Sequence, residues 1–128
     1  MKPGDERELA LEGIDPTSYV EGAPQQGDER WSHRWRGRVW RFGSESNLRR
    51  FQQSPERYAP AYDGYCELAM SFGKLAQANP RAFRLEGDRV YLGGSPAVSK
   101  VASWVPGLRR RADAAWRRLQ EQASRQTP

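Results

Sequence analysis

A chain of 128 residues is long enough for one domain with its own hydrophobic core. Charged residues make up 29% of the chain, the formal net charge is +5, and no apolar run approaches the roughly 20 residues of a membrane span, so a membrane-spanning protein is excluded. The single cysteine, Cys66, excludes both an intramolecular disulfide and a zinc site built from several thiolates.

The first 30 residues are expected to hold little regular structure. Residues 1–8 are charged and aperiodic, which is typical of a flexible arm, and residues 9–30 are rich in Gly, Pro and Asp, which favours extended chain and turns. The segment has no apolar stretch of the kind that forms a signal peptide. We therefore expect a cytoplasmic location for the chain as written, and a periplasmic one if a leader has been removed.

A hairpin and a helix are predicted next. Aromatic and polar residues alternate from Trp31 onward, which predicts antiparallel strands over 31–36 and 38–42 with one aromatic face. Ser44 then stands where a helix cap is expected, and the helix is predicted to run through about Gln53.

The most buried element is expected to be a helix from Gly64 to about Ala78. Its apolar residues recur at helical spacing over so wide an arc that the helix is predicted to lie at the centre of the domain. They form two adjacent stripes, one of Tyr65, Leu68, Phe72 and Leu75 and the other of Cys66, Ala69, Met70 and Gly73.

The rest of the chain predicts a second hairpin, within "FRLEGDRVYL", and two more helices. Ser95 begins one helix, which Pro106 ends, and a last helix runs from about Leu108 to Ala123. The residues reveal no internal repeat. The sequence therefore predicts a small single α+β domain with two β-hairpins, a central buried helix and two C-terminal helices, with a tail over 120–128.

Cys66 is the first candidate for chemistry. In the first turn of the predicted helix, free backbone N–H groups and the positive end of the helix dipole would stabilise a thiolate. Asp63 and Glu67 bring negative charge close to the sulfur and oppose this effect. The alternative role is that of a small buried hydrophobe, among the commonest for a free cysteine. The residues leave both interpretations open.

A soft metal ion is the second candidate, with copper as the expected ion. Met70 lies four residues after Cys66, so their side chains share a helical face, and a thiolate with a thioether suits Cu(I). His33, the single histidine, adds a third ligand if the first hairpin packs over the start of the central helix; the alternative is a satisfied core or surface histidine. The pocket around the thiol is expected to be lined by Tyr62, Asp63 and Tyr65.

Familiar catalytic templates are missing from the sequence. It contains no Walker loop, no dinucleotide-binding fingerprint, no HExxH, no GxSxG and no paired cysteines. His33 is the only histidine that a nucleophile such as Cys66 would have as its base. A non-enzymatic protein is therefore favoured.

Nucleic acid is one hypothesis for a partner. All basic residues except Lys2, Lys74 and Lys100 are arginines, whose planar guanidinium binds phosphate bidentately. The hypothesis ranks last because the arginines are scattered and form neither a recognised motif nor a clear basic stripe. The sequence specifies no other partner and no oligomeric state.

Three stretches resemble the bacterial YHS domain proteins over about residues 9–118. They are "GIDPTSYVEG", "GRVWRFGSESNLRRFQQSPERYAPAYDGYCELAMSFGK" and "VYLGG" followed by a helix that contains tryptophan. The resemblance implies a YHS-type domain over residues 9–119. Short YHS domains are similar to the TRASH modules, which hold metal through cysteines. Here the two corresponding places hold Thr17–Ser18 and Gly43, so this sequence departs from the metal-binding pattern.

The resemblance instead implies a role for the "GYC" element, Gly64-Tyr65-Cys66. Some members of the family are selenoproteins, with selenocysteine at this place, which implies a chalcogen atom used chemically. The leading expectation is thus a YHS-type domain in which the Cys66 sulfur binds a soft metal ion or is reversibly oxidised. The alternative is a non-catalytic binding or scaffold module with a structural cysteine.

Overall fold

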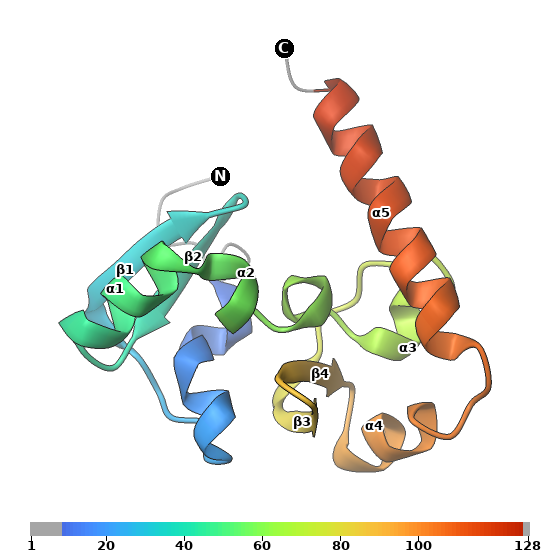
Figure 1. Ribbon diagram of the computed structural model, residues 1–128, viewed down its shortest axis with the longest axis horizontal. Helices are drawn as coiled ribbons and strands as arrows, with labels where there is room; N and C mark the ends of the chain where they lie inside the picture. Colours follow the sequence, from blue (N-terminus) through green and yellow to red (C-terminus); the bar gives the residue numbers. More distant parts are fainter. Residues whose placement is uncertain (1–8, 127–128) are drawn as a thin grey trace.

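The structure is a computed structural model that describes residues 9–126, so the arm predicted over 1–8 lies outside the described part. Two antiparallel hairpins alternate with short helices, and one long helix follows them (Figure 1). The small α+β domain with two hairpins and two C-terminal helices is confirmed. In chain order, with η denoting a 3-10 helix, the elements are η2 Ala10–Gly13, η3 Pro16–Glu21, β1 Asp28–Trp35, β2 Arg38–Phe42, α1 Glu45–Gln53, α2 Pro55–Tyr58, η4 Ala61–Gly64, α3 Glu67–Met70, β3 Asn79–Glu86, β4 Arg89–Gly93, α4 Pro96–Ala102 and α5 Leu108–Gln126.

The chain folds as two copies of one structural unit, which we call the first repeat (residues 9–53) and the second repeat (residues 60–104). Elements of the first repeat recur 51 positions later: β1 and β2 correspond to β3 and β4, and α1 corresponds to α4. The hairpin registers match as well, since Asp28 pairs with Phe42 and, 51 positions on, Asn79 pairs with Gly93. The expectation that the chain contains no internal repeat is therefore wrong.

Each repeat begins with the same unusual backbone. Leu11 and Glu12 in the first repeat, and Tyr62 and Asp63 in the second, have φ between 52 and 60°. This left-handed region costs a residue with a side chain roughly 1–2 kcal/mol. Because the strained pair recurs in both repeats, the strain belongs to the repeated fold and not to one functional site.

The helices α1 and α4 begin at equivalent serines. The Ser44 hydroxyl oxygen accepts a hydrogen bond from the backbone N–H of Asn47, and that of Ser95 accepts one from Val98, both at 3.1 Å. Each bond satisfies an N–H group that the helix itself leaves without a partner. The predicted starts of both helices are confirmed.

The two repeats share a core and form one domain. The larger apolar cluster combines Trp40, Phe42 and Phe51 of the first repeat with Val90 and Leu92 of the second. The Phe51 ring packs against its aromatic neighbours with centroids 5.1–5.4 Å apart from those of Trp35, Trp40 and Phe42. Such contacts explain why the predicted aromatic face of the first hairpin is turned toward helix α1.

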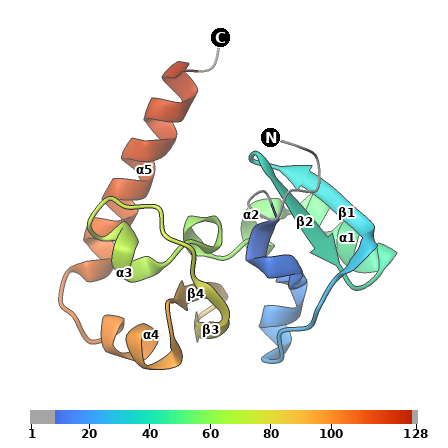
Figure 2. The same cartoon turned by 180° about the vertical axis from the view of Figure 1, so that it is seen from behind.

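Helix α5 completes the core of the second repeat. The positions of Phe42 and Phe51 are held in the second repeat by the small residues Gly93 and Ala102. A separate apolar cluster brings Ala112 and Ala115 of α5 against side chains of this repeat, among them Tyr62, Met70 and Tyr91. α5 therefore packs on the second repeat, and its far end projects from the body of the molecule (Figure 2).

The central helix is much shorter than predicted. α3 spans only Glu67–Met70, and Gly73, with φ of 76°, ends the turn that follows it. Phe72 and Leu75 lie beyond the helix and are 73% and 54% exposed. A short buried helix does stand at this place, but its predicted extent over 64–78 is wrong.

The last helix is longer than predicted. α5 continues through residues 120–126, where the sequence predicts a tail. Its buried residues include Leu108, Ala112 and Ala115, as the predicted apolar stripe requires. Within residues 9–126, none of the helices combines the length and apolarity that crossing a bilayer demands.

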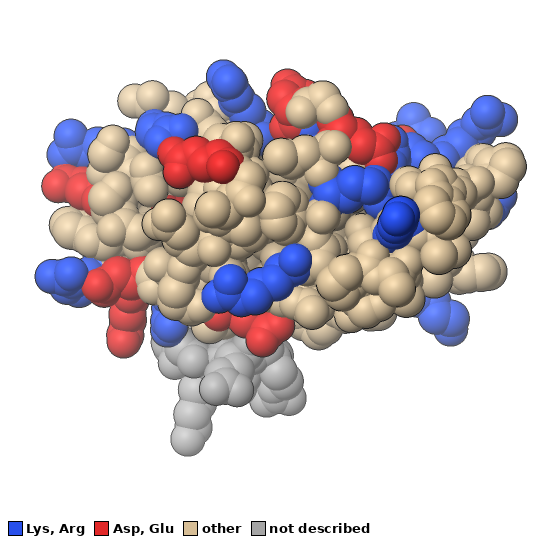
Figure 3. Space-filling view, turned by 90° about the horizontal axis from the view of Figure 1, so that it is seen from below, with Lys and Arg blue, Asp and Glu red and all other residues tan. Residues whose placement is uncertain are grey.

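Charged side chains are spread over the surface. On the face seen from below, Lys and Arg side chains are interspersed with Asp and Glu, and no continuous basic stripe crosses it (Figure 3). Several arginines are engaged in ion pairs with neighbouring carboxylates, for example Arg49 with Glu45 at 2.7 Å and Arg30 with Asp28 at 2.9 Å. Exposed pairs of this kind contribute little to stability.

Candidate functional site

Cys66 lies at the start of α3, inside the second repeat. It is the N-cap residue of the helix and is 7% exposed. Its backbone N–H donates to the carbonyl oxygen of Ala76 at 2.9 Å, and it forms a β-bridge with Leu92. The predicted position at a helix start is thus correct, but the helix has a single turn and offers only a small dipole.

The first repeat has an aspartate at the place of Cys66. Asp15 is the N-cap residue of η3, as Cys66 is of α3, and its backbone N–H donates to Gln25 O at 2.8 Å, just as Cys66 bonds Ala76. Asp15 is 1% exposed. The repeat therefore provides a direct comparison between a buried carboxylate and a buried thiol in one backbone setting.

The carboxylate of Asp15 is fully supplied with hydrogen-bond donors. One oxygen accepts from the backbone N–H and the hydroxyl of Thr17, at 2.8 and 2.7 Å. The other accepts from the Gly43 N–H and the Asn47 side-chain amide, both at 2.8 Å. These four bonds explain how the charge is kept inside the protein.

The second repeat changes the donors together with the acceptor. Thr17 corresponds to Leu68 and Asn47 to Val98, so both side-chain donors around Asp15 are replaced by aliphatic residues around Cys66. Only the backbone N–H groups of Leu68 and Gly94 remain at the equivalent places. At these two places the second repeat therefore offers the Cys66 thiol no side-chain donor.

Of the three expected metal ligands, Cys66 and Met70 lie at the two ends of α3, where the Met70 N–H donates to the Cys66 carbonyl oxygen at 3.0 Å, and His33 lies in another part of the domain. Met70 is fully buried in the apolar cluster beneath α5. His33 lies on β1 in the first repeat, with its ring 6.3 Å from that of Phe51 and its Nδ1 3.4 Å from the Gln52 amide. Among the described residues, no group of three or more His, Cys, Asp or Glu side chains is arranged to hold a metal ion.

The two places where the YHS resemblance would put metal-binding cysteines do meet in the structure. Thr17 and Gly43 bond opposite oxygens of the Asp15 carboxylate. The carboxylate bridges Thr17 and Gly43. This local arrangement connects η3 to the end of the first hairpin.

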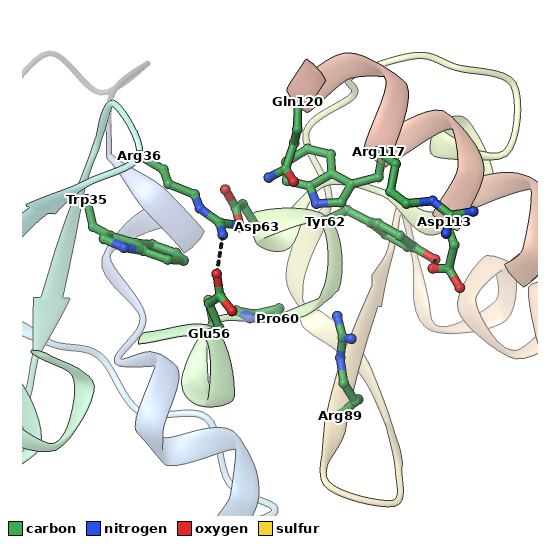
Figure 4. Close-up of a pocket in the computed structure, with 12 residues that line it drawn as sticks. Trp35, Arg36, Glu56, Pro60, Tyr62, Asp63, Arg89, Asp113, Arg117 and Gln120 are labelled. Atoms are coloured by element: carbon green, nitrogen blue, oxygen red, sulfur yellow. Dashed lines mark hydrogen bonds and ion pairs between the residues drawn. The ribbon is translucent and has the colours of Figure 1, made fainter. Parts of the chain in front are cut away.

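The expected pocket residues separate into two groups. Tyr62 and Asp63 line a cleft of about 370 Å³ between the two repeats, whose other residues come from the first hairpin, α2, the link from α2 to η4, β4 and α5 (Figure 4). Tyr65 instead packs against Trp116, with ring centroids 6.5 Å apart, and under the Arg38 guanidinium at 4.7 Å. Cys66 is not among the residues that line this cleft.

Arg36 fixes one side of the cleft. Its guanidinium bonds Asp63 at 3.0 Å and Glu56 at 2.8 Å, and lies 4.3 Å from the centre of the Trp35 ring. These contacts tie the turn of the first hairpin to α2 and to η4. Asp63 is held further because its carbonyl oxygen accepts a hydrogen bond of 2.8 Å from Arg38.

The opposite side of the cleft is built on Tyr62 and α5. The Tyr62 hydroxyl donates to the Asp113 carboxylate at 2.8 Å, and its ring lies 6.2 Å from those of Trp116 and Tyr91. The lining thus includes two indoles, Trp35 of the first hairpin (Figure 4) and Trp116 of α5. Aromatic surface of this kind is typical of small-molecule sites.

Two further arginines border the cleft. Arg89 rises from the start of β4 into the space between the two sides, and Arg117 extends from α5 (Figure 4). Arg89 lies 5.9 Å from the Tyr91 ring. Within the described part of the chain neither guanidinium forms an ion pair, whereas Arg36 forms two.

Burial changes the acidity of two residues in the cleft. It raises the pKa of Asp63 above its usual value, and the positive charge of Arg36 reverses part of this rise. Burial and the hydrogen bond to Asp113 both raise the pKa of Tyr62 well above its usual value. Tyr62 is therefore a neutral hydrogen-bond donor at physiological pH.

The sequence alone does not reveal most of the cleft. Its patterns place Trp35 on the aromatic face of a hairpin and Trp116 on the apolar stripe of a helix, and neither pattern marks a site residue. Arg36, Arg89 and Asp113 carry no signal, because the segments that hold them meet only in the folded chain.

Comparisons with known proteins give no relative. No protein-family model, no curated protein and no solved structure matches this chain.

Proposed function

We propose that the protein is a non-catalytic binding module of the YHS type that takes a small ligand in the cleft between its two repeats. The observation that carries this proposal is the composition of the cleft, where both repeats and α5 contribute aromatic and charged side chains. Its volume, about 370 Å³, lies within the range of roughly 300–1,000 Å³ that ligand pockets occupy.

The lining supports binding more than catalysis. Its polar groups are guanidinium, carboxylate, phenol and amide groups, which orient a ligand through hydrogen bonds and charge. The cleft is also ordered before a ligand arrives, because Arg36 and Tyr62 are held by bonds to Asp63, Glu56 and Asp113. Such preorganisation lowers the entropy cost of binding.

In this proposal Cys66 is part of the fold. The replacement of Asp15, Thr17 and Asn47 by Cys66, Leu68 and Val98 exchanges a hydrogen-bonded carboxylate for a thiol among aliphatic side chains. Replacing the aspartate alone would leave the donors of Thr17 and Asn47 without an acceptor, and the simultaneous replacement of all three residues avoids this cost. Cys66 thus occupies in the second repeat the position that Asp15 occupies in the first, and serves there as a structural residue.

The test is a fragment screen followed by nuclear magnetic resonance on labelled protein. The indole N–H signals of Trp35 and Trp116 should move on binding, while that of Trp104, 67% exposed and outside the cleft, stays in place. Gln120→Tyr, which puts a larger side chain into the cleft, should abolish these shifts. Gln122→Tyr, two residues along α5 and outside the cleft, is the matched control. Fragments that bind without moving either indole signal would contradict the proposal.

A second candidate function, thiol chemistry or soft-metal binding at Cys66, rests on a different observation. Asp15, at the equivalent position, accepts hydrogen bonds from two backbone N–H groups, so the repeated backbone suits an atom that carries negative charge there. We expect a working thiol to be alkylated by iodoacetamide in the folded protein, or to take up one Cu(I) in competition with a chelating dye. Both signals would be lost in Cys66→Ser. Alkylation at the rate of unfolding and no copper uptake would leave the cysteine a structural residue.

A further inference from the structure

The carboxylates of the cleft are all hydrogen-bonded to other side chains, whereas two of its arginines form no ion pair among the described residues. Of its three carboxylates, Asp63 and Glu56 are bonded to Arg36, and Asp113 accepts the Tyr62 hydroxyl. The guanidinium groups of Arg89 and Arg117 have no such partner among the described residues. The formal charges of the three carboxylates and three arginines of the cleft sum to zero, and its two guanidinium groups without a carboxylate partner are those of Arg89 and Arg117.

Aromatic surface accompanies these two arginines. Trp116 lies on the same helix as Arg117, one residue before it, and Trp35 stands across the cleft (Figure 4). A ring that enters between the two sides would pack on Trp116 on one side and, on the other, on the Arg36 guanidinium that lies over Trp35. An acidic group attached to that ring would reach the guanidinium groups at the border.

We propose that the ligand of the cleft is a small aromatic anion, whose ring packs between Trp116 and the Arg36 guanidinium that covers Trp35, and whose carboxylate or phosphate is bound by Arg89 and Arg117. The proposal rests on the function proposed above, since it names the chemical class of the same ligand. Guanidinium groups bind both kinds of oxyanion through paired hydrogen bonds, so the two share one recognition chemistry.

The opposite charge is the main rival. Aromatic side chains close to carboxylates also suit a quaternary ammonium ion, which is attracted to the faces of indole rings. Here, however, the Trp35 face is covered by the Arg36 guanidinium at 4.3 Å, and Glu56 and Asp63 are engaged with that same arginine. A cation would have to displace Arg36 from all three contacts.

The experiment is a titration of the whole chain with five probes, followed through the indole signals of Trp35 and Trp116. Phenyl phosphate and benzoate carry a ring and an anion, inorganic phosphate carries the anion alone, benzyl alcohol carries the ring alone, and benzyltrimethylammonium carries the opposite charge. We expect the two aromatic anions to bind at least about tenfold more tightly than the other three, because only they use both parts of the site. Their relative affinity then distinguishes a phosphate ligand from a carboxylate ligand.

Variants assign the two parts of the ligand to their residues. Arg89→Gln and Arg117→Gln should each weaken phenyl phosphate about fivefold or more, and the double variant should bring it to the level of benzyl alcohol. Arg81→Gln, an exposed arginine on β3 outside the cleft, is the control and should bind like the parent. Because all three side chains are exposed, melting temperatures close to that of the parent are expected and would verify folding.

The results distinguish the proposed anionic class of the ligand from the proposal that the cleft binds a ligand at all. If benzyl alcohol or benzyltrimethylammonium moves the same indole signals as strongly as phenyl phosphate, the cleft binds ligands but the anionic class is wrong. Aromatic anions that bind equally well to the double arginine variant would also show that the anionic class is wrong. If none of the five probes moves either indole signal and the fragment screen also fails, both proposals are wrong.

Discussion

Asp15 and Cys66 occupy the same position of a repeated backbone, each as the N-cap residue of the short helix that follows a left-handed turn. The two side chains differ in charge, and the residues around them differ accordingly. Thr17 and Asn47 give hydrogen bonds to the carboxylate, whereas Leu68 and Val98 stand in their places near the thiol. The same backbone position thus holds a hydrogen-bonded carboxylate in the first repeat and a thiol without these side-chain donors in the second.

The comparison predicts unequal costs for removing the two side chains. Asp15→Ala leaves several buried donors without an acceptor, so we expect a loss of about 3 kcal/mol in the free energy of unfolding. Cys66→Ala removes a single buried sulfur atom, and a loss of about 1 kcal/mol is expected. Urea denaturation of both variants measures the difference. Equal losses would mean that the thiol has bonding partners comparable to those of the carboxylate.

A second pair of variants tests which aromatic residues hold the core. Phe51 is fully buried among Trp35, Trp40 and Phe42, so Phe51→Ala should cost about 3–5 kcal/mol. Phe72 is 73% exposed, and Phe72→Ala should change stability by less than about 0.5 kcal/mol. Chemical denaturation distinguishes the two. A large loss of stability from Phe72→Ala would instead mean that Phe72 is buried, as it would be in the long central helix that the sequence predicts.

The hairpins are predictable from the sequence, and the central helix is not, for physical reasons. In the first hairpin the alternation of Trp31, His33 and Trp35 coincides with a strand whose other side is exposed, which is the case that alternation describes. Between Gly64 and Ala78, apolar residues recur at helical spacing although the chain turns at Gly73. The spacing of apolar residues does not show that a glycine adopts a positive φ and ends the helix.

Neither the repeat nor the cleft could be predicted from the sequence, for related reasons. Few residues are identical at equivalent positions of the repeats, and those that are, such as Gly13 and Gly64 or Ser44 and Ser95, serve turns and caps found in many folds. The core side chains differ because α5 fills the second repeat from outside. The cleft in turn joins segments far apart in the chain, which no local pattern brings together.

Acid should weaken the domain through Glu86. Hydrogen bonds from Arg109, and less strongly from Arg84, lower the pKa of this carboxyl from 4.5 to about 2. A lowered pKa means that Glu86 stabilises the folded state above about pH 4.5 and that this contribution is lost as the pH falls toward 2. Melting temperatures should therefore fall less steeply over this interval in Glu86→Gln than in the parent. Glu29→Gln, an exposed carboxylate on β1, is the control, and identical slopes in Glu86→Gln and the parent would contradict the prediction.

Alkali should weaken the domain through its buried phenols. Burial raises the pKa of Tyr19, Tyr62 and Tyr91, and the hydrogen bond to Asp113 adds to the rise for Tyr62. A raised pKa means that the neutral phenol stabilises the folded state below about pH 10 and that this contribution is lost at higher pH, because the unfolded chain ionises first.

Tyr62→Phe isolates one of these phenols. At pH 7 the variant lacks the bond to Asp113 that joins η4 to α5, and a loss of about 1.5 kcal/mol is expected. Above about pH 10 the parent loses stability through ionisation of Tyr62 in the unfolded state, and the variant does not, so the difference between them should shrink. Urea denaturation at pH 7, 10 and 11, with absorbance at 295 nm to follow phenolate, measures both effects. The loss of stability caused by Tyr19→Phe should also shrink as the pH rises. A constant difference between Tyr62→Phe and the parent would mean that Tyr62 ionises as freely in the folded protein as in the unfolded chain, and a growing difference would mean that it ionises more readily in the folded protein.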